Sequence, residues 1–319
     1  MNKEDNVIWP FLRLTVVVIV ICVIGYTHGY LYSFDADEVE EASYRGAKRA
    51  YQEQRQQEQR ERLAIAMQMA REDLKNAKVG GYARFGAYPY STSGKMALIE
   101  WHVISKKGNC LLLITADAID YKPMYDDKDY KFVPGRDVMS WHMSSMRRWL
   151  NEDFYNLAFI EDDAKLIETT IVEEEVNGSL ENPDKSTLVS KDKVFLIGVD
   201  ALNNYYHNVN NRLTLPTPYA KKLGARGEWW LRTTVGDANF AFVDANFHCV
   251  PQGKYFGEMC GVAPAIWINP NGATQDFHQS DAKEEKFEDV IASPAAARAS
   301  NSVSGEALPS SLREQTPRK

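Results

Sequence analysis

The sequence predicts an α+β protein in which an N-terminal transmembrane helix and a helical stalk precede an irregular, loop-rich and mainly antiparallel domain. Three observations lead to this fold class. An uncharged apolar run lies at residues 14–26, and a polar stretch rich in helix-forming residues follows it to residue 78. Short apolar or alternating runs, broken by Gly, Pro, Asn and Asp, then fill residues 82–269. Strands and helices do not alternate strictly there, which argues against a doubly wound parallel sheet.

The apolar run reads LTVVVIVICVIGY, and less apolar flanks extend it to a predicted membrane span at residues 14–32. About 20 helical residues cross the ~30 Å hydrocarbon core of a bilayer. Arg13 precedes the run and an acidic stretch at 35–41 follows it, so the positive-inside rule places residues 1–13 in the cytoplasm and the bulk of the chain outside it. Two alternatives are a cleaved signal peptide, which would export the domain equally, and a buried helix of a soluble domain.

Residues 33–78 are predicted to form the stalk, because no proline occurs from Asp35 to Lys78 and residues with high helix propensity dominate. The segment YQEQRQQEQRER at 51–62 is polar on every side, as expected of a solvated helix. An apolar stripe appears only later, at Leu63, Met67, Ala70 and Leu74. It packs either on the domain or on a second copy of the helix, although no sustained heptad pattern supports a coiled coil.

One globular domain is expected over residues 79–270. The candidate strands are 97–105, 110–116, 193–198, 229–233, 239–244 and 261–268, and the candidate helices are 144–151, 153–159, 162–169 and 198–204. From residue 271 the chain turns to Ser, Ala, Pro, Gln and charged residues with almost no aromatic ones. Such a composition buries too little surface to offset the entropy of ordering, so residues 271–319 are predicted to be a disordered tail.

Composition and motifs exclude several classes of function. The net charge is -7 and the only stretch dense in basic residues, 45–62, is of mixed sign, which argues against nucleic acid as a partner. The four cysteines and six histidines have no metal-ligand spacing, so we expect no metal and no cofactor. No serine lies in a nucleophile elbow and no glycine-rich phosphate loop occurs, so no catalytic residue is assigned.

Seven segments occur in the order found in an uncharacterised bacterial domain family with no agreed activity, which the chain resembles over nearly all of residues 82–269. They are FGAYP (85–89), IEWHVI (99–104), SWHMSSMRRWLNEDFYNLAF (140–159), DKVFLIGVDALNNYY (192–206), LPTPYA (215–220), WWLRTT (229–234) and GVAPAIWI (261–268). The family usually ends Gly-Val-Arg-Pro-Ala, whereas this chain has Ala263 in place of the arginine. Any role of that arginine is therefore in doubt here.

The paired-Trp strand, the Gly-rich return and the closing strand also resemble the fold shared by C-type lectins and the sulfatase-modifying enzymes. This resemblance implies a C-type-lectin-like domain. The calcium-binding signatures of classical lectins and the copper-binding cysteine pair of the sulfatase-modifying enzymes are absent, so it implies neither metal site.

Two sets of aromatic and polar residues, far apart in sequence, are the ligand-binding candidates. They are Trp141, Arg147 and Asn151 in the first set, and Trp229, Trp230 and Arg232 in the second. In a shared groove, indole rings would stack on a sugar or peptide and a guanidinium would bind a carboxylate. The alternative is structural, with an N-capped helix at 144–151 and tryptophans that fill the core. Because neighbours on a strand point to opposite faces, we expect Trp229 inside and Trp230 outside, on the same face as Arg232.

Cys249 and Cys260 are separated by a short stretch that contains Pro and Gly, and in an oxidising compartment a disulfide between them could close it. The chain offers two classes of function. One is a membrane-anchored extracytoplasmic recognition or scaffold module that contacts membrane lipid through the N-terminal helix and binds a glycan or protein ligand. The other is a cell-envelope enzyme acting on glycan or protein, for which His102, His142, Asp237 and His248 would have to converge. The sequence leaves the oligomeric state open.

Overall fold

The computed structural model describes residues 36–126, 139–177, 188–206, 214–274 and 284–286. The chain divides into two compact units, Met1–Glu61 and Arg62–Lys319. The predicted cytoplasmic tail and membrane span, residues 1–32, lie outside the described residues. In the part of the chain that the structure describes, no helix is both long enough and apolar enough to cross a membrane.

Helix α2 spans Ala36–Leu74, as the helix propensity of this segment predicts. Side chains from residue 41 to residue 62 are exposed, as the all-round polar pattern predicts. Farther along, Met67, Ala70 and Leu74 are buried in the domain, and Arg71 Nη1 lies 2.8 Å from Asp163 Oδ1. Burial raises the pKa of Asp163, and the hydrogen bond from Arg71 opposes that shift. The apolar stripe therefore packs on the domain, which is one of the two predicted alternatives.

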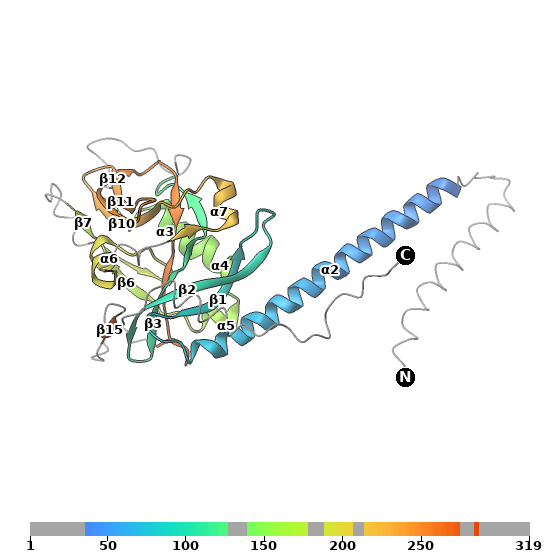
Figure 1. The fold of residues 1–319 in the computed structure, drawn as a ribbon, viewed down its shortest axis with the longest axis horizontal. Coiled ribbons are helices and arrows are strands. Elements are labelled where there is room, and N and C mark those ends of the chain that lie inside the picture. Colours follow the sequence, from blue (N-terminus) through green and yellow to red (C-terminus); the bar gives the residue numbers. More distant parts are fainter. Residues whose placement is uncertain (1–35, 127–138, 178–187, 207–213, 275–283, 287–319) are drawn as a thin grey trace. The chain divides into compact units, whose positions relative to one another are not determined.

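The first sheet has five strands (Figure 1). Its main path runs β1 (Tyr82–Pro89), β2 (Met96–Lys107), β3 (Cys110–Thr115) and β14 (Ala265–Ile268), and β15 (Glu284–Lys286) also pairs with β2. Every pair in this sheet is antiparallel. β1 and β15 both lie on the edge of β2 away from β3, one at each end of that long strand.

The second sheet has six strands and places β10 in its interior. Its path is β12 (Cys249–Tyr255), β11 (Asn239–Val243), β10 (Trp229–Val235), β13 (Cys260–Val262) and β5 (Asp120–Lys122), with β7 (Val176–Asn177) also on β10. Two small pairs complete the strands: β4 (Asp117–Ala118) with β9 (Leu215–Pro216), and β6 (Thr170–Glu173) with β8 (Val189–Asp192). Antiparallel pairing dominates, which agrees with the predicted α+β class.

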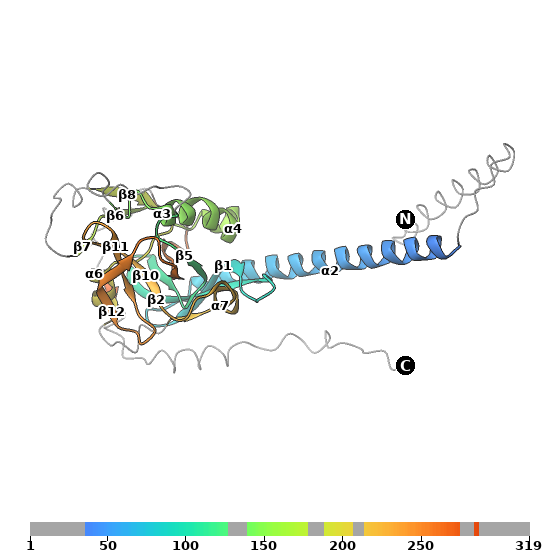
Figure 2. The ribbon, with the colours of Figure 1, turned by 90° about the horizontal axis from the view of Figure 1, so that it is seen from above.

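A helical run lies beside the sheets, as seen from above in Figure 2. It consists of α3 (Ser145–Trp149), the π-helical turn η1 (Leu150–Phe154) and α4 (Tyr155–Ala158). Ser144 is its N-cap, as predicted, and its side chain accepts a hydrogen bond from Arg147 N. The remaining helices are short: α5 (Glu161–Ala164), α6 (Val199–Tyr205) and α7 (Pro218–Leu223).

The structure corrects three predictions about the domain. Residues 193–198 do not form a strand, and only Phe195 makes an isolated bridge, to Ala265. The predicted strand 261–268 is divided at Pro264, because proline cannot donate to a sheet ladder, and its halves β13 and β14 join different sheets. Finally, residues 284–286 form strand β15 within the segment predicted to be a disordered tail. Strands β1 and β12 were not among the candidates.

Candidate functional site

Both tryptophans of the Trp229-Trp230 pair are buried, with 1% and 0% of their surface exposed, so the prediction that one faces solvent is wrong. Strand alternation exposes a side chain only where one face of the sheet meets water, and both faces of β10 are covered here. Lys254 Nζ lies 5.9 Å from the centre of the Trp230 ring. Trp230 Nε1 donates a 2.9 Å hydrogen bond to the Lys122 carbonyl. The ring therefore offers no surface for stacking on a ligand.

Trp141 and Arg147 of the other set converge on one buried carboxylate, that of Asp192. Trp141 Nε1 donates to Asp192 Oδ2 at 2.9 Å, and Arg147 Nε donates to Asp192 Oδ1 at 2.6 Å. The Ser190 hydroxyl donates to Oδ2 at 2.7 Å. Trp141 and Asp192 are fully buried, so these donors provide the hydrogen bonds that a buried charge requires. They hold strand β8 against helix α3.

Asn151 binds the backbone that follows β8. Its Oδ1 accepts from Lys193 N at 2.7 Å and from Val194 N at 3.1 Å, and its Nδ2 donates to Val194 O at 2.8 Å. These side-chain bonds satisfy backbone groups that a strand would satisfy through a ladder. This explains why the apolar run 193–198 is buried without being a strand.

Arg232 of β10 contacts the far end of the segment 193–198 and pairs with Glu175. Its Nη2 is 3.4 Å from Glu175 Oε2, and its Nη1 donates to Leu196 O at 3.4 Å. Burial lowers the pKa of Arg232, and the negative charge of Glu175 opposes that shift. A Cβ on Gly198 would lie 1.7 Å from Glu175 Oε2, so glycine is required for this close approach.

The two predicted sets thus meet around residues 190–198, in what we term the polar network, which consists of Arg147, Asn151, Glu175, Asp192 and Arg232. The fold brings residues of the two sets together, as the prediction of a shared site requires. The tryptophans beside them are buried, and each charged group has a partner inside the protein. The arrangement matches the structural alternative rather than an open groove.

The cysteine prediction is also wrong in this structure, since Cys249 and Cys260 do not form a disulfide. Cys249 begins β12 and Cys260 begins β13, and β11 and β10 lie between these strands. Strands are spaced about 4.8 Å apart, so three spacings separate the two residues by far more than the ~7 Å limit between the Cα atoms of a disulfide. Cys260 is buried, and so is Cys110, which lies in β3 of the first sheet.

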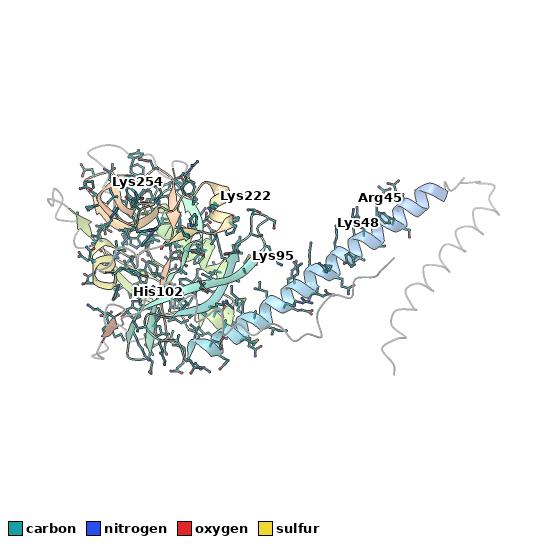
Figure 3. All side chains as sticks on the ribbon, in the orientation of Figure 1. Arg45, Lys48, Lys95, His102, Lys222 and Lys254 are labelled. Carbon is teal, nitrogen blue, oxygen red and sulfur yellow. The ribbon has the colours of Figure 1, made fainter. Side chains whose placement is uncertain are left out.

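The four residues of the enzyme alternative do not form one cluster. His102 lies on β2 in the first sheet, far in the fold from β12, where Lys254 is labelled (Figure 3). His102 Nδ1 is 2.9 Å from the hydroxyl of Tyr206. Asp237 and His248 are exposed in the turns at opposite ends of β11, and His142 precedes α3. Among the residues described, no three His, Cys, Asp or Glu side chains are grouped as metal ligands.

A groove of about 450 Å³ lies elsewhere, where the end of α2 meets the β1–β2 hairpin. The hairpin is the one with Lys95 near its tip in Figure 3. Most of the lining is apolar or aromatic: Leu63, Ala66, Tyr88, Pro89, Tyr90, Ala97, Leu98, Ile99 and Ile119. Its polar lining residues are Arg84, Glu100, Asp117 and Thr217. Apolar walls with a few polar groups are typical of binding sites.

Two opposite charges in the groove have no ion-pair partner among the residues that the structure describes. Arg84 on β1 and Glu100 on β2 are direct neighbours across the strands, and both line the groove. Within the described ranges, neither side chain forms an ion pair or hydrogen bond, with the other or with any third group. This distinguishes them from the charges of the polar network, each of which is bound inside the protein.

The aromatic side of the groove is held rigidly. The Tyr88 hydroxyl donates a 2.6 Å hydrogen bond to the buried Asp120 carboxylate, and the Tyr88 ring packs edge-on against Tyr219 of α7. Burial, reinforced by the Asp120 charge, raises the pKa of Tyr88, so its hydroxyl stays protonated. Tyr219 N donates to Tyr90 O at 2.8 Å. Tyr90 beside them is 46% exposed and available to a ligand.

Sequence reasoning missed this groove as a site. The segment FGAYP that contributes Tyr88 and Pro89 was noted only for its resemblance to a family. The available signal was Tyr88-Pro89-Tyr90, two aromatic residues around a proline at the end of a hairpin strand. Nothing local indicates that α2 covers one side of it.

The fold defines a mixed α+β domain with mainly antiparallel sheets. The model of the family described as domain of unknown function (DUF6273) matches residues 108–270. The chain belongs to this family. The match confirms the predicted membership in a family of unknown function, over fewer residues than the expected 82–269. The chain has no match among curated proteins and none among solved structures.

Proposed function

We propose that this protein is a membrane-tethered, extracytoplasmic recognition module that binds a segment of a protein ligand in the groove between α2 and the β1–β2 hairpin. The observation that carries the proposal is the pair Arg84 and Glu100. They line a largely apolar groove, stand side by side on adjacent strands and have no ion-pair partner in the described residues. A ligand with a complementary acid and base would pair with both.

The lining favours a peptide over the glycan that was the other expected ligand. Glycan recognition was expected from tryptophan faces, and Trp141, Trp229 and Trp230 are all buried. The groove instead offers Leu63, Leu98 and other aliphatic residues, with Tyr90 as its exposed aromatic ring. Such a surface suits apolar peptide side chains, while Arg84 and Glu100 set the order of charges along the peptide.

The location outside the cytoplasm rests on the sequence. The apolar segment 14–32 is preceded by Arg13 and followed by an acidic stretch, which favours a cytoplasmic N-terminus. Helix α2 is exposed along residues 41–62 before its end enters the domain, as a spacer between a membrane and a binding unit would be. A C-type-lectin-like fold remains part of this proposal.

The groove can be tested with the full chain in mild detergent against a library of extended peptides. Selected peptides should carry one acidic and one basic residue beside apolar ones. Arg84→Ala and Glu100→Ala should each weaken binding by about tenfold, which corresponds to loss of one charge-assisted contact. Arg226→Ala, which removes an exposed arginine outside the groove, is the matched control and should bind as the parent does.

Reversing the charges sharpens the test. The double variant Arg84→Glu with Glu100→Arg should prefer peptides in which the acid and base are exchanged. If no peptide is selected, or if selected peptides bind all these variants equally, the groove is not the recognition site.

A further inference from the structure

A second possible binding surface lies at the other end of β2, where strand β15 is attached. β1 pairs with β2 from Met96 to His102, and β15 pairs with it from Ser105 to Lys107. β15 has only three residues, and they lie far from β2 in sequence, beyond the last strand of the sheet's main path. The edge of β2 at 105–107 therefore receives a separate extended segment by strand addition, a known mode of peptide recognition.

One side chain of this segment enters a prepared polar site. Glu284 Oε1 accepts a 2.6 Å hydrogen bond from the Ser105 hydroxyl and a 2.8 Å hydrogen bond from the Tyr205 hydroxyl. Ser105 is fully buried, and Tyr205 projects from α6, an element unrelated to β2 in sequence. Two hydroxyls from different elements thus converge on one carboxylate oxygen.

The strand register places one basic residue, Lys107, opposite this acid. Glu284 is opposite Lys107 and Glu285 is opposite Lys106 in the antiparallel pair. Opposite charges on facing positions of two strands favour their pairing. Backbone pairing, the carboxylate site and the facing Lys107 together specify an extended segment that contains glutamate.

We propose that the β2 edge at Ser105–Lys107, with Tyr205, is a docking site for an extended acidic peptide, and that the chain's own segment 284–286 occupies it as an internal competitor. A peptide in trans binds there once this segment leaves. The site is separate from the groove, which lies at the Ala97–Glu100 end of β2. Its existence does not depend on the proposed function of the groove.

The test uses a fluorescent peptide with the sequence of residues 280–290, SDAKEEKFEDV, and the full-length chain. The variant Glu284→Ala weakens the internal competitor, so it should bind the peptide at least about tenfold more tightly than the parent chain does, because a site occupied in most molecules shows a reduced apparent affinity. Glu173→Ala is the matched control, since it removes an exposed glutamate from another strand and should bind as weakly as the parent.

The contacts themselves are tested in the Glu284→Ala background. Adding Ser105→Ala or Tyr205→Phe should abolish the gain, and a peptide with alanine in place of its Glu284 should fail to bind. Hydrogen exchange of residues 105–107 should become faster in Glu284→Ala and slow again when the peptide is added. Equal binding by the parent and Glu284→Ala, or exchange that does not respond to the variant, would overturn the proposal.

Discussion

The polar network and the groove both combine arginine with acidic side chains, but they use these charges in opposite ways. In the network, Asp192 is 0% exposed and its ion-pair partner Arg147 is 26% exposed. In the groove, Arg84 is exposed and Glu100 is half-buried, and neither has an ion-pair partner among the described residues. The network lies inside the family match at 108–270, whereas Arg84, Glu100 and the α2 lining precede it.

This difference shows that charged residues beside aromatic ones can have either of two roles. Charges that hold buried backbone in place stabilise the fold. Removing one of them leaves the opposite charge buried without an ion-pair partner. Charges without partners on an apolar wall contribute little to stability and remain available to a ligand. The motifs that carry Trp141, Arg147 and Arg232 contain residues of the first kind.

The largest effect should come from Trp230→Ala. Removal of this fully buried ring should lower the free energy of unfolding by roughly 3–5 kcal/mol, measured by urea denaturation. Tyr90→Ala, which truncates an exposed ring of the groove, should change it by less than about 0.5 kcal/mol. If Trp230→Ala instead lowered ligand affinity while stability was unchanged, the contrast between the two regions would be lost.

An intermediate effect is expected for Asp192→Asn. The change keeps the shape of the side chain but replaces the ionic bond to Arg147 with a neutral one, which should destabilise the protein by about 2 kcal/mol. Glu100→Gln is the matched change in the groove and should stay within about 0.5 kcal/mol of the parent. Equal losses in the two variants would show that Glu100 is bound inside the folded protein.

The smallest effect should be that of Arg84→Ala on stability. An exposed arginine without an ion pair should alter the free energy of unfolding by no more than about 0.5 kcal/mol, while the same change weakens peptide binding. Parallel urea denaturation and binding measurements on one preparation separate these two quantities. A clear loss of stability would show that Arg84, like the residues of the polar network, is bound within the folded protein.

Much of the fold followed from the sequence where a segment is continuous and apolar. β2, β3, β10 and β11 were predicted close to their observed bounds, and the long helix α2 and the Ser144 cap were also predicted. β1 and β12 were missed because each contains glycine and proline within the strand. Gly86 and Gly253 adopt φ values of 64° and 71° there, beside register shifts in the pairing.

The site was less predictable, because burial of a strand face depends on segments elsewhere in the chain. Trp230 is covered by Lys254 of β12 and its ring nitrogen is bound by Lys122 of β5, and neither contact has a local signal near residue 230. The groove also depends on segments that are distant in sequence, because Leu63 of α2 and Thr217 beside α7 line one groove only in the folded chain. Lack of an ion pair at Arg84 is likewise a property of the fold.

The two buried thiols lie in different sheets and could report the opening of each sheet separately. Burial, with the nearby charge of Glu168, raises the pKa of Cys110 in β3 to about 12. Burial also raises the pKa of Cys260 in β13. Because the thiolate is the reactive form, both should resist alkylation until their strands separate. The alkylation rates of the two cysteines would then measure, in one molecule, whether the sheet that holds the tail strand opens before the sheet that holds the tryptophan pair.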